Sequence, residues 1–153
     1  VHSLVGGWRA TTTWDMLDAA AGGDAASALL QLDRLLAAGE HPVALLGPMG
    51  FTLRRFATAA RIVQEAQDAK RRVSVGDALK QAGVKPFVLR KAEPQLRQLG
   101  RQRALQLHRW LLETDLDLKG ASQLPPRVVL ERLIVKMSRQ MNPDASQGAK
   151  SRA

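Results

Sequence analysis

The chain has 153 residues, and its shares of 45% hydrophobic and 24% charged residues are typical of one soluble globular domain. It contains no Cys, which excludes a disulfide, a thiolate metal site and a cysteine nucleophile, and which fits a cytoplasmic location. No apolar run reaches the roughly 18 residues that a membrane span requires, so we expect no membrane segment. The formal net charge is +9, and residues 51–110 hold 14 basic and 4 acidic side chains, a net charge of +10. That segment is either a contact for phosphates or an acidic partner, or an Arg-rich solvated surface.

Two short helices are predicted in the first 40 residues. Thr13 can cap a helix over residues 14–21, which ends at two successive glycines that suit a left-handed C-cap. Asp24 can cap the second helix, and Gly39 ends it. The predicted apolar stripe of this second helix, interrupted by one polar residue, consists of Ala26, Leu29, Leu30, Asp33 and Leu36.

A long third helix is predicted from Pro42, because the N–H that proline lacks has no helical partner in the first turn. Gly47 and Pro48 should kink this helix or split it, since a proline removes one hydrogen bond and collides with the preceding turn. The apolar residues that share one stripe of this helix are Leu45, Leu46, Leu53, Phe56, Ala60 and Val63.

Four more helices follow. Ser74 opens a short helix that ends at Gly83, and Pro86 begins the next one, which Pro94 should break or kink before Gly100. A helix over residues 101–118 then carries Leu107, Leu111, Thr114 and Leu118 at near-heptad spacing, and Gly120 closes it. The last helix opens at Pro125-Pro126, and its apolar stripe consists of Leu130, Leu133, Ile134, Met137 and Met141.

The fold class predicted from these elements is all-α, a bundle of about seven helices with short connections. No strand-like alternation is sustained, and Leu and Ala rather than aromatic residues supply most apolar positions. Residues 142–153 are polar and small, so we expect them to be disordered.

The sequence offers no constellation for catalysis or for a cofactor. Residues 47–50 (GPMG) lack the Lys-Ser/Thr of a phosphate loop, and Pro48 removes an amide that such a loop needs. The three histidines have no His or Glu partner three or four residues further on, so we predict no metal site. Asp115 and Asp117 lie on different sides of a helix, so they do not form an acid–base pair. We therefore predict that the chain is not an enzyme.

Residues 74–91 form the one motif that suggests a binding function, a possible DNA-binding helix-turn-helix. Its apolar residues, spaced as in that motif around Gly83, are Leu79, Val84 and Leu89. The basic residues that the second helix would bring to DNA or phosphate are Lys85, Arg90 and Lys91. However, Leu79 stands where a small residue is usual, and Pro86 begins the would-be recognition helix. A helix-turn-helix used only for packing is therefore the favoured interpretation.

Three stretches of the sequence occur in a characteristic order. The first, TWDMLDAAAGGDAASALLQLDRLLAAGEHPVALLG, gives a short helix, a Gly-Asp turn, a Leu-rich helix and a Gly-Glu-x-Pro entry to a long helix. The second is VKPFVLRKA, and the third, LLETDLDLKGASQLPPRVVLERLIVKM, gives an acidic helix end followed by a terminal helix that starts at proline. Together they cover about residues 12–140 and resemble the C-terminal collar domain of the delta subunit of a bacterial DNA polymerase III clamp loader.

This resemblance implies a non-catalytic oligomerisation domain over residues 12–141, preceded over residues 1–11 by a linker or the end of a lid domain, and followed by the tail. Because the chain opens with Val1, we expect it to be part of a longer subunit. The implied partners are the collar domains of the tau or gamma and delta-prime subunits. No cofactor is implied, and DNA binding should be weak and non-specific.

The family's interface positions are spread over helix faces, and the resemblance points to the last two helices. The residues expected to be exposed members of the subunit interface are Trp110, Asp115, Lys119, Arg127 and Arg132. The alternative for each charged residue is a solvated charge. For Trp110 the alternative is internal packing.

Overall fold

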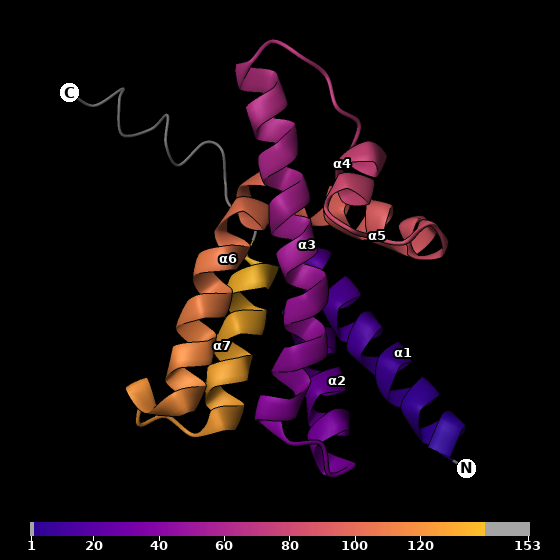
Figure 1. The fold of residues 1–153 in the computed structure, drawn as a ribbon. Helices are drawn as coiled ribbons and strands as arrows, with labels where there is room; N and C mark the ends of the chain where they lie inside the picture. The colour runs from indigo at the N-terminus through magenta and orange to yellow at the C-terminus, as the bar shows by residue number, and fades with distance from the viewer. Residues whose placement is uncertain (1, 140–153) are drawn as a thin grey trace, which may run out of the picture.

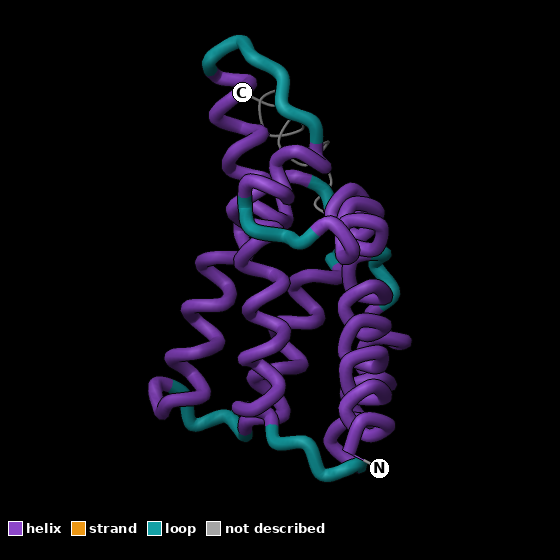
Figure 2. Tube along the Cα trace, turned by 45° about the vertical axis from the view of Figure 1, so that its right-hand side comes forward, coloured by secondary structure: helices purple, strands orange, loops and turns teal. Residues whose placement is uncertain are grey.

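The computed structural model describes residues 2–139, with side chains described from Gly7 onward. Within that range the regular elements are all helices (Figures 1 and 2), which confirms the predicted all-α bundle. In chain order the elements are α1 (His2–Ala21), α2 (Ala25–Ala37), α3 (Pro42–Asp68), α4 (Val75–Gln81), α5 (Pro86–Leu99), α6 (Arg101–Leu116), the wide helical turn η1 (Asp117–Ala121) and α7 (Pro126–Ser138).

The 27-residue helix α3 is the centre of the arrangement (Figure 1). It packs along α6 on one side and contacts the short helix α4 near its C-terminal end. Helices α1 and α2 pack against each other and both contact α7, while α5 joins α4 to the start of α6. The bundle therefore has an α6–α7 side and an α4–α5 side, separated by α3.

The core consists mainly of leucine and alanine, and burying each leucine side chain contributes roughly 1.5–3 kcal/mol. The largest side chains that are almost fully buried include Met16, Leu17, Leu32, Leu53, Phe56, Leu79, Leu107 and Leu133. The apolar stripe predicted for α7 is confirmed, since its members Leu130, Leu133, Ile134 and Met137 are at most 1% exposed. Met141, the last predicted member, lies outside the described residues, as does the predicted tail.

Arg103 is a buried cation at the start of α6 that joins the C-terminal ends of three helices. Its Nε donates to Leu99 O at 2.7 Å, and its Nη2 donates to Ala21 O at 2.8 Å and to Gln98 O at 3.0 Å. Its Nη1 donates to Met137 O. The last carbonyls of a helix lack intrahelical partners and carry partial negative charge, so one guanidinium satisfies the ends of α1, α5 and α7 together. Burial lowers the pKa of Arg103, which nevertheless stays charged because arginine titrates far above neutral pH.

The predicted start of the first helix at residue 14 is wrong. Helix α1 begins at His2 and passes through Thr13 without a break, so Thr13 is not a cap. Residues 2–12 contain no proline, and an internal glycine costs only about 1 kcal/mol, which does not stop a helix whose next turns bury Met16 and Leu17. The assignment of residues 1–11 to a preceding domain or linker stays a prediction.

The apolar stripe predicted for α2 is only partly correct: Leu29 and Leu36 are partly buried against the core, and Asp24 caps the helix as expected, accepting from Ser27 N at 3.1 Å. Its three buried residues are Ala28, Leu32 and Leu35, whereas Asp33 is exposed and Leu30 is 51% exposed. Leucines occupy several sides of α2, so their spacing alone does not fix which side faces the core. Only Asp33, a polar residue within the predicted stripe, indicated that this side of α2 is not the fully buried one.

Two prolines lie inside continuous helices rather than at breaks. Pro48 lies within α3, where its neighbours Leu46 and Met49 are buried, and Pro94 lies within α5. The packing of buried residues before and after each proline offsets the backbone hydrogen bond that the proline removes. Helix α6 ends two residues earlier than predicted and widens into η1, where Gly120 closes it with a φ of +110°.

Candidate functional site

Helix α6 carries two stripes of leucine, and only one of them faces the core. Leu107 and Leu111 are buried against α3, as the sequence predicts. The other stripe is exposed, with Leu105 at 36%, Leu112 at 59% and Leu116 at 49%. These three residues, which we call the α6 leucine stripe, are seven and four positions apart and therefore lie along one face of the helix. The near-heptad spacing of residues 101–118 did not predict this stripe, although the surplus of leucines there was its signal.

Of the five predicted interface residues, Asp115, Lys119, Arg127 and Arg132 lie near this stripe or on the adjacent helix α7. Asp115 and Lys119 form an ion pair at 2.8 Å. Arg127 binds Glu131 at 2.9 Å and also pairs with Asp33 of α2. Exposed ion pairs of this kind contribute little to stability, so these residues remain open to an intermolecular contact.

Arg132 is exposed and lies on the surface between α6 and α7. It lines a hollow of about 260 Å³ together with Leu116 of the leucine stripe and Glu113. Glu113 also accepts from Lys136 at 3.2 Å, across the two helices. Of the predicted charged residues, Arg132 therefore lies on the same surface as Leu116 of the stripe.

The prediction that Trp110 is an exposed interface residue is wrong. Its side chain is only 8% exposed and belongs to the core. Trp110 follows Leu107 by three positions, which places it on the buried side of α6. Thr114 Oγ1 donates to the carbonyl oxygen of Trp110 at 2.7 Å, so the polar groups on this face of α6 are paired within the helix.

The predicted helix-turn-helix is present as α4, a turn and α5. Ser74 Oγ accepts from Asp77 N at 3.1 Å, which confirms the predicted cap. Gly83 has a φ of +96°, a conformation that favours glycine, and Leu79 and Val84 are buried beside it. Leu89, the third apolar member, is half-buried.

The three basic residues proposed for DNA or phosphate contact are exposed on this unit. Lys85 is the residue before α5, and Arg90 and Lys91 lie on its first turns. Within residues 7–139, none of the three has a carboxylate within ion-pair distance. Their charges are therefore available to an anionic partner.

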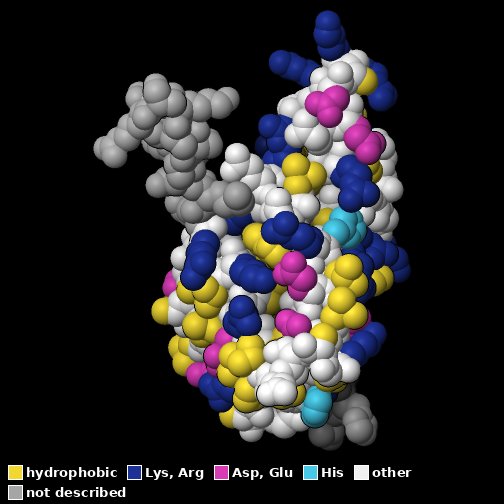
Figure 3. All heavy atoms as spheres, turned by 90° about the vertical axis from the view of Figure 1, so that its left-hand side faces the viewer, with side chains coloured by type: hydrophobic (Ala, Val, Ile, Leu, Met, Phe, Trp, Pro, Cys, Tyr) yellow, Lys and Arg dark blue, Asp and Glu magenta, His cyan; other side chains and the backbone are white. Residues whose placement is uncertain are grey.

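The positive charge of residues 51–110 is not gathered in one patch. Lys70, Arg71 and Arg72 are exposed in the loop after α3, which matches the cluster of Lys and Arg at the upper tip of the face in Figure 3. Arg97 and Arg109 are instead paired with carboxylates on their own helices. The net charge of the segment thus overstates the charge at any one place.

The two histidines whose side chains are described have structural surroundings. His41 caps α3, since its Nδ1 accepts from Val43 N at 3.2 Å. His108 is half-buried on α6, and burial, followed by the charges of Arg61 and Arg54, lowers the pKa of its imidazole. No group of three His, Cys, Asp or Glu side chains suited to a metal ion occurs in the described part of the chain. The helices described there are also too short or too polar to cross a membrane.

One family model, described as the DNA polymerase III delta subunit, C-terminal domain, matches residues 10–137. No curated protein and no solved structure matches the chain. The family match extends from the middle of α1 to the end of α7, and so includes both the helix-turn-helix and the α6–α7 surface. The family is a domain of a clamp-loader subunit and takes part in DNA replication. The chain belongs to the family of C-terminal domains of the DNA polymerase III delta subunit.

Proposed function

We propose that this domain is a non-catalytic collar module, which packs against the corresponding C-terminal domains of the tau or gamma and delta-prime subunits in the cytoplasm. In this role it holds the clamp loader together while other domains act on the sliding clamp. The single observation that carries the proposal, beside family membership, is the α6 leucine stripe. Three large apolar side chains exposed on one helix face are typical of a surface that a protein partner covers.

The surroundings of the stripe also support a protein interface. Such interfaces combine an apolar centre with a polar, partly hydrated rim. Asp115 and Lys119 lie three positions after Leu112 and Leu116, so the ion pair borders the leucines on the same helix. Arg132 borders them from α7 through the hollow that it shares with Leu116. We propose Asp115, Lys119, Arg127 and Arg132 as rim residues.

The test is co-elution of the chain with purified collar domains of tau or gamma and delta-prime in size-exclusion chromatography. The variant Leu112→Glu places a charge in the apolar centre and should abolish co-elution. The matched control is Leu30→Glu on α2, because Leu30 is exposed to a similar extent but lies outside the stripe. If both variants co-elute as the wild type does, or if the wild type does not co-elute, the proposal fails.

DNA binding by α4 and α5 is the second candidate function, and the exposed Lys85, Arg90 and Lys91 support it. A titration with duplex DNA at increasing salt separates the two functions, because phosphate contacts lose affinity steeply as salt rises. We expect weak binding that disappears at about 200 mM salt. Sequence-specific binding that survives this salt and is lost in the double variant Arg90→Glu, Lys91→Glu would favour DNA recognition. We also expect no nucleotide hydrolysis.

A further inference from the structure

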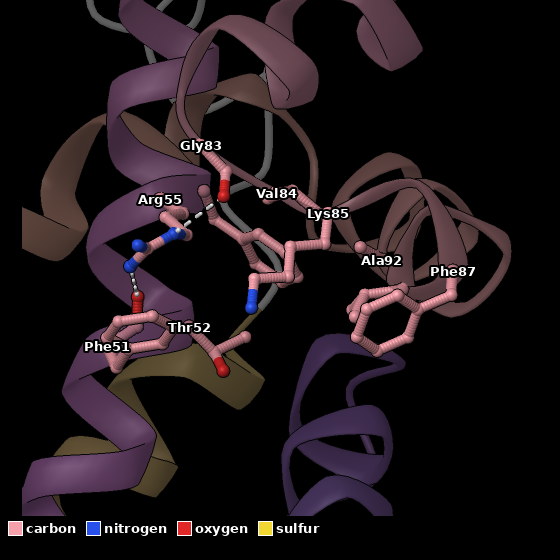
Figure 4. Close-up of a pocket in the computed structure, with 10 residues that line it drawn as sticks. Phe51, Thr52, Arg55, Gly83, Val84, Lys85, Phe87 and Ala92 are labelled. Atoms are coloured by element: carbon pink, nitrogen blue, oxygen red, sulfur yellow. Dashed lines mark hydrogen bonds between the residues drawn. The ribbon is translucent and has the colours of Figure 1, made fainter.

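An apolar groove lies between α3 and the turn that joins α4 to α5, away from the α6 leucine stripe. The chain has three phenylalanines, and all three line this groove: Phe51, Phe56 and Phe87. Phe56 forms its buried floor, whereas Phe51 is 58% exposed and Phe87 is 78% exposed. Figure 4 shows Phe51 and Phe87 on opposite sides of the opening. We call this feature the Phe51–Phe87 groove.

The two walls of the groove are held together by Arg55. Arg55 lies over the ring of Phe51, with 3.5 Å between the guanidinium carbon and the ring centroid. Its Nη1 donates to Phe51 O at 3.3 Å and its Nε donates to Gly83 O at 3.4 Å (Figure 4). One side chain thus ties α3 to the α4–α5 turn and fixes the distance between the two walls. A preformed site loses less conformational entropy on binding.

The charges at the groove are all positive. Its lining residues include Arg55 and Lys85 but no Asp or Glu. Figure 4 shows the Lys85 side chain extending into the space between Phe51 and Phe87. Among the described residues, neither cation has a carboxylate within ion-pair distance. The exposed Arg90 and Lys91, three and four positions after Phe87, continue this charge along the same face of α5.

The size and lining of the groove select the kind of occupant. Its volume of about 290 Å³ lies just below the range for small-molecule sites, roughly 300–1,000 Å³, and suits one or two amino-acid side chains. Val84, Val88 and Ala92 complete an apolar wall. A nucleic-acid base enclosed there would find few polar side chains beside Thr52, Arg55 and Lys85, and leaving its remaining hydrogen-bonding groups without partners is costly. An aliphatic or aromatic side chain has no such cost.

We propose that the Phe51–Phe87 groove binds an acidic peptide segment of a partner protein. One or two apolar side chains of the segment enter between Phe51 and Phe87, and flanking Asp or Glu side chains pair with Lys85 and with the basic residues of α5. This surface is separate from the α6 leucine stripe, so the domain could contact its collar neighbours and hold this segment at the same time.

A phage-displayed library of random dodecapeptides, selected on the immobilised chain, tests the proposal. The enriched peptides should combine Leu, Phe or Trp with flanking Asp or Glu. A fluorescein-labelled synthetic copy of the most enriched peptide should bind in an anisotropy titration. Phe87→Ala and Lys85→Glu should each weaken that binding by about tenfold or more. Both side chains are exposed, so the variants should fold, which circular dichroism melting checks.

The matched control is Leu30→Ala, which removes an exposed apolar side chain from α2, outside both the groove and the α6 leucine stripe, and should leave peptide affinity unchanged. The proposal is overturned if no peptides are enriched, if the enriched peptides are basic, or if they bind the Phe87→Ala variant as tightly as the wild type. Tighter, Phe87-dependent binding of oligo-dT would assign the groove to single-stranded DNA instead. Dimerisation that Phe87→Ala abolishes would assign it to a second copy of the chain.

Discussion

The α6 leucine stripe and the Phe51–Phe87 groove both expose large apolar side chains, but they differ in shape and in the state of their charges. The stripe lies on the convex surface of one helix, and most of the charges beside it are already paired, as in Asp115 with Lys119 and Glu113 with Lys136. The groove is hollowed between two elements, and Lys85 at its mouth has no carboxylate partner in the described part of the chain.

This difference shows that pairing, rather than net charge, indicates what an apolar surface binds. Charges that are already neutralised locally make few demands on a partner, so the stripe suits a broad protein face. Free cations beside an apolar hollow favour a ligand that brings carboxylates, because only such a ligand compensates them. The segment with a net charge of +10 contains both situations, since Arg109 is paired on α6 while Lys85 is not.

The largest expected effect is on the bundle that supports both surfaces. Ile134 is fully buried in α7, so Ile134→Asp would bury a carboxylate without a partner. We expect the free energy of unfolding to fall by about 4 kcal/mol or more, as measured by urea denaturation with circular dichroism. The control Arg132→Asp changes an exposed residue two positions away and should alter stability by less than about 0.5 kcal/mol. Equal losses in both variants would show that the buried side of α7 is assigned wrongly.

Ile134 was predictable because Leu130, Leu133 and Met137 place it in the middle of an apolar stripe. The helix starts at Asp24, Pro42 and Ser74 were predictable because a cap is a local signal. The length of α1 could not be predicted, because no proline or strong capping residue within residues 2–21 marks where the helix begins. The buried face of α2 could not be predicted either, because leucines lie on several of its sides. Local patterns therefore predicted which segments are helical better than which sides of them are buried.

The candidate surfaces were less predictable than the fold. The sequence pointed to the last two helices, yet it placed Trp110 outside and did not separate the two leucine stripes of α6. The groove depends on Phe51 and Phe87, which are distant in the sequence and meet only when α4 and α5 pack beside α3. The role of Arg103 depends equally on carbonyls from three separate helices.

The second-largest expected effect is on the interaction that anchors the helix ends of the bundle, and not on either surface. Arg103→Met keeps the apolar stem but leaves carbonyls at the ends of α1, α5 and α7 without their donor. We expect a loss of about 3 kcal/mol in the free energy of unfolding. Arg103→Lys should not restore it, because an ammonium group lacks the planar fork of donors. Arg101→Met, which changes an exposed residue, is the control, and an equal loss there would contradict the assigned role.

A smaller effect, on binding alone, tests whether the two surfaces are independent. Leu112→Glu should weaken assembly with the collar partners by about tenfold or more and leave binding of the selected acidic peptide unchanged. Phe87→Ala should do the reverse. Both residues are exposed, so neither variant should change the melting temperature appreciably. If either variant impaired both activities in isothermal titration calorimetry, the stripe and the groove would be parts of one surface.

The smallest expected effect concerns the seam between α3 and α6, where His108 lies half-buried. Burial, followed by the charges of Arg61 and Arg54, lowers its pKa from the ordinary value of 6.5. The unfolded chain therefore takes up this proton at a higher pH than the folded chain. Its contribution to stability is complete above about pH 6.5 and is lost as the pH falls through the lowered folded pKa. Because the side chain is partly exposed, we expect a loss below about 1 kcal/mol.

Urea unfolding of the wild type and His108→Gln at about pH 7.5 and pH 5.5 isolates this contribution, because the other titrating groups are common to both chains. The wild type should lose more stability on acidification than the variant. Arg61→Gln removes one of the two positive charges near the imidazole, so it should raise the pKa of His108 in an NMR titration. A pKa above 6.5 in the wild type, or an equal loss of stability in both chains, would mean that the seam accommodates a charged imidazole. The α3–α6 packing between the two surfaces would then be more hydrated than the structure indicates.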